Sequence, residues 1–425
     1  MIIYTVRPGD TLDSVARQYS LSPALIAADN GIVSPLVEGQ SLVLRQPALT
    51  YTVEAGDTLF SVAASFGTTE NVLWQNNPLL GGRNAVYPGQ TLVISYGPPT
   101  LGTNISLNGY AYTYISEDTL RRTLPYLTYL SVFSYGLNPD GTLVPPRQDD
   151  GRLIALARQY GAVPIMMLTS ITAQGTFSNE LINTVLQSEA LTASVITAAA
   201  NTVREKGYGG IETDFEYISA ENAQAYIDFV SALKAELGPG YTVFTDLAPK
   251  TSAAMPGLLY EAHNYPALGE AADFLFLMTY EWGYSYGPPM AVSPINNVRR
   301  VLDYAVSEIP REKLFMGLPS YGYDWPLPYE RGVTAAQSLS SREAIELASY
   351  QGVPIQFDTE AMAPYFNYTE DGIEHIVWFQ DARSTEALAS LADEYSLGGI
   401  GVWNIMRPFQ SMWSVISGLY GINKL

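Results

Sequence analysis

Three acidic residues alternate with apolar or small residues in one short stretch, G-Y-G-G-I-E-T-D-F-E-Y at positions 207–217. Glu212, Asp214 and Glu216 fall on every second position, and in a β-strand such side chains point to the same face. Acids are depleted in strands, and neighbouring carboxylates raise the affinity of at least one of them for a proton. A carboxyl that keeps its proton can act as a general acid. The other interpretation, an exposed edge strand with one polar face, is disfavoured by the apolar alternate positions and the flanking helical patterns.

The composition limits the partners and cofactors of the 425-residue chain. Its 42 acidic and 22 basic side chains give a formal net charge of −20, which argues against nucleic acid or an anionic membrane as a partner. Cysteine is absent and the two histidines, His263 and His375, lie far apart, so a metal site or a Ser-His triad is disfavoured. We expect no metal and no cofactor. The 30 tyrosines and six tryptophans suit stacking on sugar rings, although ordinary core packing would also use them.

Targeting segments are not evident in the sequence. No apolar run approaches the ~20 residues that span a bilayer. The first residues, M-I-I-Y-T-V-R-P-G-D, lack the basic segment followed by an apolar one that is typical of a secretion signal. We therefore expect a protein made in the cytoplasm without an export signal.

A repeat occupies the N-terminal part of the chain. Y-T-V-R-P-G-D-T-L-D-S-V-A from Tyr4 recurs as Y-T-V-E-A-G-D-T-L-F-S-V-A from Tyr51. Each unit predicts a strand, a helix that begins at G-D-T, a second helix and a closing strand, which is a small βααβ domain.

The two units resemble LysM domains, which bind N-acetylglucosamine-containing glycans such as peptidoglycan and chitin. The alternative for their Asp and Thr residues is that they only cap helices. On the resemblance, glycan contacts are expected at Gly9, Asp10, Thr11 and Asn30 in the first unit and at Gly56, Asp57, Thr58 and Asn76 in the second.

From Ile105 onward, strand-like segments alternate with helical ones, and eight such units predict an α/β fold, a (β/α)8 TIM barrel. Active sites of this fold lie at the carboxyl ends of the strands, and Asp214 and Glu216 lie at the end of the fourth. The seventh unit is longer, and residues 329–381 predict a small α/β insertion that forms one wall of the substrate groove. The expected strands are Ile105–Tyr112, Tyr129–Tyr135, Val163–Thr169, Gly210–Tyr217, Thr242–Ala248, Phe274–Tyr280, Leu314–Pro319 and Gly399–Asn404.

These patterns predict the domain organisation. Residues 1–47 and 48–96 form the two repeats, and residues 103–425 form the barrel with its insertion at about 329–381. Residues 97–102 include Gly97-Pro98-Pro99, a stiff linker that would hold the second repeat at a limited set of distances from the barrel.

Residues 103–420 resemble family-18 glycoside hydrolases, whose fourth strand carries D-G-x-D-x-D-x-E. The stretch G-G-I-E-T-D-F-E from Gly209 keeps the last two acids, whereas Gly209 and Glu212 stand where the family has Asp. M-T-Y-E from Met278, M-G-L-P-S-Y-G from Met316 and G-V-W-N from Gly401 match further family segments.

The resemblance implies a substrate-assisted, retaining mechanism. Glu216 would protonate the glycosidic oxygen, Asp214 would orient the 2-acetamido group that acts as nucleophile, and Tyr280 would hydrogen-bond the acetamido oxygen. Trp403 would form the apolar floor under the sugar. Further candidates for substrate binding are Glu212, Tyr110, Trp282, Tyr321 and Glu281.

Within the family, the two LysM units, the D-F-E core and Y-E-W followed by G-P-P-M-A-V-S-P (280–282 and 287–294) resemble spore cortex-lytic N-acetylglucosaminidases of endospore-forming bacteria. This implies a hydrolase of N-acetylglucosamine linkages in peptidoglycan, made in the mother-cell cytoplasm and acting at the spore or cell wall. We expect it to be a monomer. A LysM-anchored chitinase remains an alternative. A non-catalytic glycan-binding protein or a spore structural protein is disfavoured by the intact pair Asp214 and Glu216.

Overall fold

The computed structural model describes all residues, 1–425. Each repeat forms the expected βααβ unit, with an antiparallel two-stranded sheet and two helices between its strands. Both first helices begin with a capping box, in which a threonine side chain and a serine side chain satisfy each other's backbone N–H groups. The elements are β1 (Ile2–Thr5), α1 (Leu12–Tyr19), α2 (Pro23–Asn30) and β2 (Ser41–Leu44), then β3 (Leu49–Thr52), α3 (Leu59–Ser65), α4 (Glu70–Asn76) and β4 (Thr91–Ser95).

The rest of the chain confirms the (β/α)8 barrel. Eight parallel strands pair in sequence order, and the last pairs with the first, so the sheet closes on itself. The strands are β5 (Asn104–Tyr112), β6 (Tyr129–Leu137), β8 (Val163–Thr169), β9 (Gly210–Asp214), β10 (Thr242–Leu247), β11 (Phe274–Leu277), β12 (Leu314–Pro319) and β18 (Gly399–Trp403).

Helices surround this barrel and bury their apolar stripes against it. They are α5 (Glu117–Thr123), α6 (Gly151–Gln159), α7 (Asn179–Leu186), α8 (Glu189–Lys206), α9 (Ala223–Leu237), α10 (Tyr265–Ala271), α11 (Ile295–Glu308), α13 (Ala382–Glu394) and α14 (Gln410–Leu419). Two short strands, β7 (Leu143–Val144) and β19 (Gly421–Ile422), extend the sheet locally. None of the helices combines the length and the apolar character that spanning a bilayer requires.

Aromatic side chains fill the interior of the barrel. Phe244, Phe276 and Phe315 project inward from neighbouring strands and pack with Tyr110 and Tyr129. Strand β18 leaves space for them, because a Cβ on Gly401 would lie 2.3 Å from the ring of Phe276 and one on Gly399 would lie 2.2 Å from the ring of Phe315. The glycines of this strand therefore admit the bulky rings that form the floor of the site.

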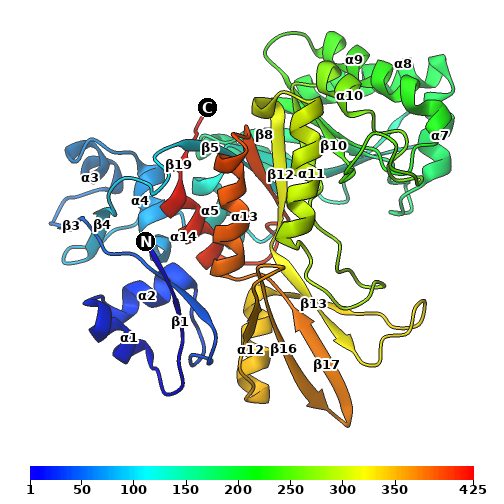
Figure 1. Cartoon of the computed structure of the whole chain (residues 1–425). Helices are drawn as coiled ribbons and strands as arrows, with labels where there is room; N and C mark the ends of the chain where they lie inside the picture. The colour runs from blue at the N-terminus through cyan, green and yellow to red at the C-terminus, as the bar shows by residue number, and fades with distance from the viewer.

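The insertion after β12 is a five-stranded antiparallel sheet with one helix. It begins at Tyr321, earlier than the expected residue 329, because the strand directly after β12 already belongs to this sheet. Figure 1 shows its long strands extending away from the barrel. The elements are β13 (Tyr321–Pro326), β14 (Gln337–Ser340), α12 (Ser341–Gln351), β15 (Gln356–Asp358), β16 (Ala363–Glu370) and β17 (Ile373–Trp378).

The second repeat shares a hydrophobic core with the barrel. The ring of Trp74 lies 4.8 Å from that of Tyr160, and Gln75 Nε2 donates to the carbonyl of Pro125 at 2.8 Å. The expected linker is itself fastened to α14, since the amide of Thr100 donates to Gly418 O at 2.9 Å. This repeat is therefore packed into the barrel domain and is not tethered beside it.

The first repeat docks through polar contacts as well. Ser414 Oγ of α14 donates to Asp29 O at 2.7 Å, and Arg45 Nη1 donates to Ser417 Oγ of the same helix at 3.3 Å. Within the repeat, Arg45 and Asp29 form a buried ion pair at 2.6 Å. The guanidinium of Arg45 also lies 4.0 Å from the ring centre of Tyr96. Helices α13 and α14 thus lie between the repeats and the barrel strands (Figure 1).

Candidate active site

Strand β9 is shorter than the sequence pattern predicted. It ends at Asp214, so Glu212 and Asp214 share its inner face while Glu216 lies on the turn that follows. Tyr217 continues this turn with a φ of 56°. The three carboxyls therefore lie at different depths. Glu212 is deep in the barrel, Asp214 is at the end of the strand and Glu216 is at the rim.

Glu212 is fully buried and accepts hydrogen bonds from two strands. The hydroxyl of Tyr110 donates to Oε1 at 2.6 Å, and Asn108 Nδ2 donates to Oε2 at 3.2 Å. The hydroxyl of Ser131 also donates to Oε2. Burial raises the pKa of Glu212, but these donors oppose that rise because they stabilise the ionised form.

A fourth carboxyl, Asp246 of β10, joins this group. It is 3% exposed and hydrogen-bonded to Glu212. Burial and the charges of Glu212 and Asp214 raise the pKa of Asp246 well above its ordinary range. Because Glu212 has three other donors and Asp246 has none, the proton of this pair resides on Asp246. The sequence reasoning missed Asp246, although a lone acid in the strand T-V-F-T-D-L is itself an unusual signal.

Asp214 and Glu216 also favour their protonated forms. Burial, followed by the charges of Glu216 and Glu212, raises the pKa of Asp214 well above its ordinary range. Burial and the charge of Glu281 raise the pKa of Glu216. Oδ1 of Asp214 and Oδ1 of Asp246 are both buried and have no hydrogen-bond partner in the protein. The site thus holds a protonated acid beside acceptors that are free for a ligand.

Glu281 follows β11 in a left-handed backbone conformation, with a φ of 64°. Tyr321 and Tyr323 of the insertion both donate their hydroxyls to it, the latter at 3.0 Å. Although part of the Glu281 side chain is open to solvent, its partial burial raises its pKa and the two phenols lower it. The insertion therefore positions the charge that acts on Glu216.

A cleft of about 580 Å³ opens above these carboxyls at the carboxyl end of the barrel. Trp403 lies at its floor, 5.2 Å from the ring of Phe133 and 5.8 Å from that of Tyr110. Tyr280 packs so closely on β12 that a Cβ on Gly317 would lie 2.6 Å from its ring. Other wall residues are Tyr112, Met167, Phe177, Tyr217, Tyr260, Met278, Trp282 and Tyr284.

The structure brings most of the expected barrel residues together. Asp214, Glu216, Tyr280, Glu281, Trp282, Tyr110 and Trp403 line this one cleft. Two do not line it: Glu212 lies behind Tyr110 and Asp246, and Tyr321 reaches the site through Glu281. No group of three or more His, Cys, Asp or Glu side chains is arranged to hold a metal ion.

The residues expected to contact glycan in the repeats lie outside the cleft. Asp10 Oδ2 accepts from the Tyr4 hydroxyl at 2.6 Å and from Arg7 N at 2.8 Å, and Asp57 makes the same bonds with Tyr51 and Glu54. Thr11 and Thr58 cap the helices that follow. Gly9 and Gly56 adopt positive φ values of 81° and 97° in the turns before them. The Asp and Thr side chains therefore serve the fold, which leaves the backbone of these turns available to a ligand.

Asn30 has a different counterpart from the expected Asn76. Asn30 Nδ2 donates to the carbonyls of Ile26 and Val43, and Asn30 Oδ1 accepts from Val43 N. Asn77 makes the matching three bonds, to Leu73 and Val93, whereas Asn76 bonds only Ile94 O. The pairing of Asn30 with Asn76 was one position off, because both asparagines stand together at the end of α4.

A closed (β/α)8 barrel with clustered acids under an aromatic cleft defines a class of protein, the TIM-barrel hydrolases of glycosidic bonds. Residues 109–407 match the model of glycosyl hydrolases family 18, and residues 4–45 and 51–95 each match the LysM domain. The chain belongs to glycosyl hydrolases family 18. It is a glycoside hydrolase with two LysM domains, which indicate binding of N-acetylglucosamine glycans such as peptidoglycan.

Known proteins resemble the chain over its full length. It is 36% identical to the cortical fragment-lytic enzyme of Bacillus anthracis, over 99% of both chains, and 39% identical to that of Bacillus subtilis, over 100% of this chain and 99% of the relative. The crystal structure of the Bacillus cereus spore cortex-lytic enzyme SleL superposes with a TM-score of 0.84 at 36% identity, covering 100% of this chain and 98% of that one. A chitinase from Chromobacterium violaceum, 23% identical with a TM-score of 0.68, shares the fold.

Proposed function

We propose that this protein hydrolyses N-acetylglucosamine linkages in spore cortex peptidoglycan or its fragments, by substrate-assisted catalysis that retains the anomeric configuration. The observation that carries the proposal is the pair Asp214 and Glu216 at the base of the aromatic cleft, with raised pKa values and a free Oδ1 on Asp214. Full-length similarity to cortex-lytic enzymes supports cortex as the material. We place the protein, as a monomer, at the spore cortex or cell wall.

In the first step Glu216 donates its proton to the glycosidic oxygen, and the bond from that oxygen to the anomeric carbon breaks. The carbonyl oxygen of the sugar's own 2-acetamido group bonds to the anomeric carbon and gives an oxazolinium ion. An intramolecular nucleophile gains a high effective molarity when its geometry is held. Asp214 Oδ1 holds that geometry by accepting the acetamido N–H, while the Tyr280 hydroxyl donates to the acetamido oxygen.

In the second step Glu216, now a carboxylate, takes a proton from water whose oxygen attacks the anomeric carbon. The acetamido group reforms, and Glu216 is again protonated. Trp403 supplies the apolar floor under the reacting ring, beside Phe133 and Tyr110. The raised pKa of Glu216 suits both roles, because general acid–base catalysis is most efficient when the pKa lies near the working pH.

Asp246 and Glu212 control the charge beneath Asp214. With its proton on Asp246 and three donors on Glu212, this pair carries one negative charge. That charge opposes ionisation of Asp214 until the substrate's N–H and the growing positive charge of the oxazolinium favour it. Glu212 stands where the family motif has its middle Asp, and Asp246 of the neighbouring strand is its hydrogen-bonding partner.

A LysM-anchored chitinase is the second candidate, because the same cleft and the same LysM domains would accept chitin. Mass spectrometry of products from purified cortex peptidoglycan and from chitin oligomers, digested side by side, distinguishes the two. We expect muropeptide products with reducing N-acetylglucosamine ends from cortex, and Glu216→Gln is expected to form none. Efficient cleavage of chitin oligomers without cleavage of cortex would favour the chitinase. Cleavage of neither substrate would leave only a glycan-binding role.

A further inference from the structure

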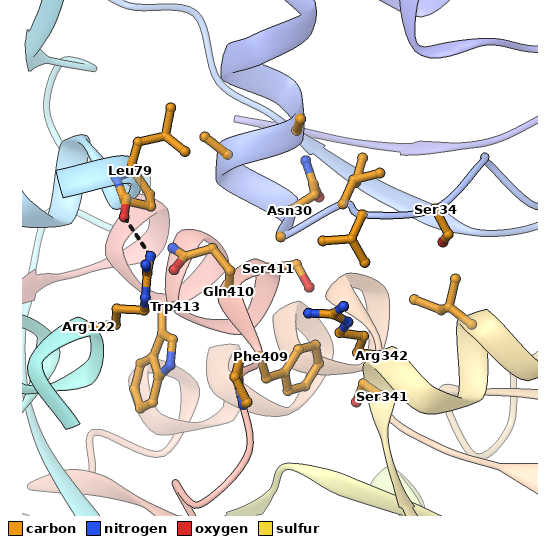
Figure 2. A pocket seen from close by; sticks show the side chains of 18 of the residues that line it. Asn30, Ser34, Leu79, Arg122, Ser341, Arg342, Phe409, Gln410, Ser411 and Trp413 are labelled. Carbon is orange, nitrogen blue, oxygen red and sulfur yellow. Dashed lines mark hydrogen bonds between the residues drawn. The ribbon is translucent and has the colours of Figure 1, made fainter. Parts of the chain in front are cut away.

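A second cavity, of about 600 Å³, lies where both repeats, the barrel and the insertion meet. None of its lining residues belongs to the catalytic cleft. Figure 2 shows side chains from all four parts pointing into the same space. The walls come from α2 and residues 30–34 of the first repeat, Pro78 and Leu79 of the second, α5 and residues 408–413 of the barrel, and the start of α12 in the insertion.

The two repeats present equivalent loops to this cavity. Asn30 and Asn77 make the same three hydrogen bonds, so the residues that follow them correspond, and Ile32 matches Leu79. Both of these residues line the cavity. Leu79 is 74% exposed and Val33 is 61% exposed, which leaves apolar side chains of two LysM domains at one opening. A pair of modules that each bind a glycan thus converges on a single space.

The opposite wall is polar, and its charges balance. Arg342 of α12 pairs with Glu346 at 2.8 Å, and Arg122 of α5 pairs with Asp118 at 2.6 Å. An anionic or a cationic ligand would have to compete with these partners, whereas a neutral ligand would not.

The polar wall also offers an unused hydrogen-bonding group. Ser341, the first residue of α12, is 1% exposed, lines the cavity, and its hydroxyl has no partner in the protein. Buried hydroxyls are ordinarily hydrogen-bonded, so this one is available to a ligand.

We propose that this cavity binds a segment of N-acetylated amino-sugar chain, held at once by both LysM domains and by the barrel with its insertion. Acetamido methyl groups and ring faces pack against Ile32 and Leu79, and sugar hydroxyls or amides bond Arg342 and Ser341. The site differs from the turns at Gly9–Thr11 and Gly56–Thr58, none of which lines it. The inference rests on the proposed function only for the identity of the glycan.

The cavity is formed before any ligand arrives, because its walls are fastened together. The carbonyl of Glu38 accepts from Ile355 N of the insertion at 2.9 Å, and Gly39 passes so close that a Cβ there would lie 1.8 Å from Ile355 O. On the other side, Ser414 of α14 donates to Asp29 O at 2.7 Å and Arg45 Nη1 donates to Ser417 Oγ of α14 at 3.3 Å, which fixes the first repeat on α14. A preformed site loses less conformational entropy on binding than separate mobile domains would.

The test is binding of an N-acetylglucosamine hexamer to the full chain, measured by isothermal titration calorimetry in the Glu216→Gln background so that the probe is not consumed. Leu79→Ser changes the repeat side of the cavity, and Arg342→Ala changes the insertion side. Tyr87→Ser, an equally exposed position in the second repeat outside the cavity, and Arg311→Ala are the matched controls. Thermal melts confirm that each variant is folded.

We expect each cavity variant to bind the hexamer about fivefold or more weakly and both controls to bind as the parent does. Unchanged affinity in both cavity variants would overturn the proposal. Weakening by Leu79→Ser with no effect of Arg342→Ala would also overturn it, because the LysM domain would then bind the glycan without the insertion. Hydrolysis of short soluble fragments, assayed with Glu216 restored, tests the proposed function separately. If the parent chain does not hydrolyse these fragments but both cavity variants bind the hexamer more weakly, the cavity proposal stands and the proposed hydrolytic function is refuted.

Discussion

The carboxyl group of Asp246 is hydrogen-bonded to that of Glu212 inside the barrel, and the two residues come from neighbouring parallel strands. Three donors surround Glu212 and none surrounds Asp246, so one partner is held ionised and the other protonated. Two acids that share a proton in this way are a recurrent solution to placing like charges in a closed site.

This relationship predicts that Asp246 acts by donating a proton to a hydrogen bond. Asp246→Asn keeps a donor toward Glu212, and we expect its kcat to stay within about threefold of the parent. Asp246→Ala removes the donor, and we expect kcat to fall about tenfold or more with a smaller change in KM. Steady-state kinetics on a soluble muropeptide measures both. Equal losses in the two variants, or no loss in Asp246→Ala, would contradict this role.

The negative charge of Glu281 is expected to set the upper pH limit of activity. That charge contributes to the raised pKa of Glu216, which in the proposed mechanism must be protonated to act as the acid. Glu281→Gln removes the charge, lowers the pKa of Glu216, and moves the alkaline limb of the kcat/KM profile to lower pH. Glu374→Gln, an exposed change in β17, is the control. A limb that stays in place, or that moves to higher pH, would show that Glu281 does not act on Glu216.

The buried acids also predict how stability depends on pH. The folded-state pKa values of Asp214, Glu216 and Asp246 are raised, so their contribution to stability is complete below the ordinary carboxyl pKa of about 4 and is lost as the pH rises through the raised values. Glu216→Gln removes one group that must ionise. We expect its Tm to exceed that of the parent by about 1–3 °C at pH 8 and to match it near pH 4. Differential scanning calorimetry at the two pH values measures the Tm difference between the variant and the parent. A larger Tm increase at pH 4 than at pH 8 would contradict the prediction.

The shared core of the second repeat and the barrel predicts that they unfold together. Trp74 is buried against Tyr160, and Trp74→Ala is expected to lower the free energy of unfolding by about 3–5 kcal/mol without dividing the melt into two transitions. Tyr87→Ser in the same repeat is the exposed control. An independent, low-temperature transition for the repeat in Trp74→Ala would contradict the shared core.

Truncation tests the same point from the chain end. If the repeats were anchors on a linker, removal of residues 1–95 would leave turnover of short soluble fragments unchanged. The structure predicts that this truncation destabilises the barrel, because it exposes the surface around Tyr126 and Tyr160 that the second repeat covers. Removal of residues 1–47 alone is expected to retain more activity. Equal barrel Tm values for the full chain and for the chain without residues 1–95 would refute the prediction.

Much of the architecture was predictable because it depends on local patterns. The repeat predicted two βααβ units, and alternating strand and helix segments predicted the barrel, whose expected strands β8 and β12 have the observed bounds. The end of β9 was placed three residues too late, since its alternating pattern continues through Glu216 into the turn. The start of the insertion was placed too late for a similar reason, because Tyr321–Pro326 follows β12 almost directly.

The sequence alone determined the family and the fold class, and it singled out Asp214 and Glu216 as the candidate acid pair, because each is encoded in short stretches of consecutive residues that can be recognised without knowledge of distant contacts. Only the tertiary structure decided that Asp246 shares a proton with Glu212, that Tyr321 holds Glu281, and that the repeats are packed into the catalytic domain. These relationships join residues far apart in the chain, and strand order, register and side-chain packing bring them together. The alternating acids Glu212, Asp214 and Glu216 thus belong to a larger cluster of carboxyl groups. Asp246 of β10 and Glu281 of the loop after β11 complete that cluster.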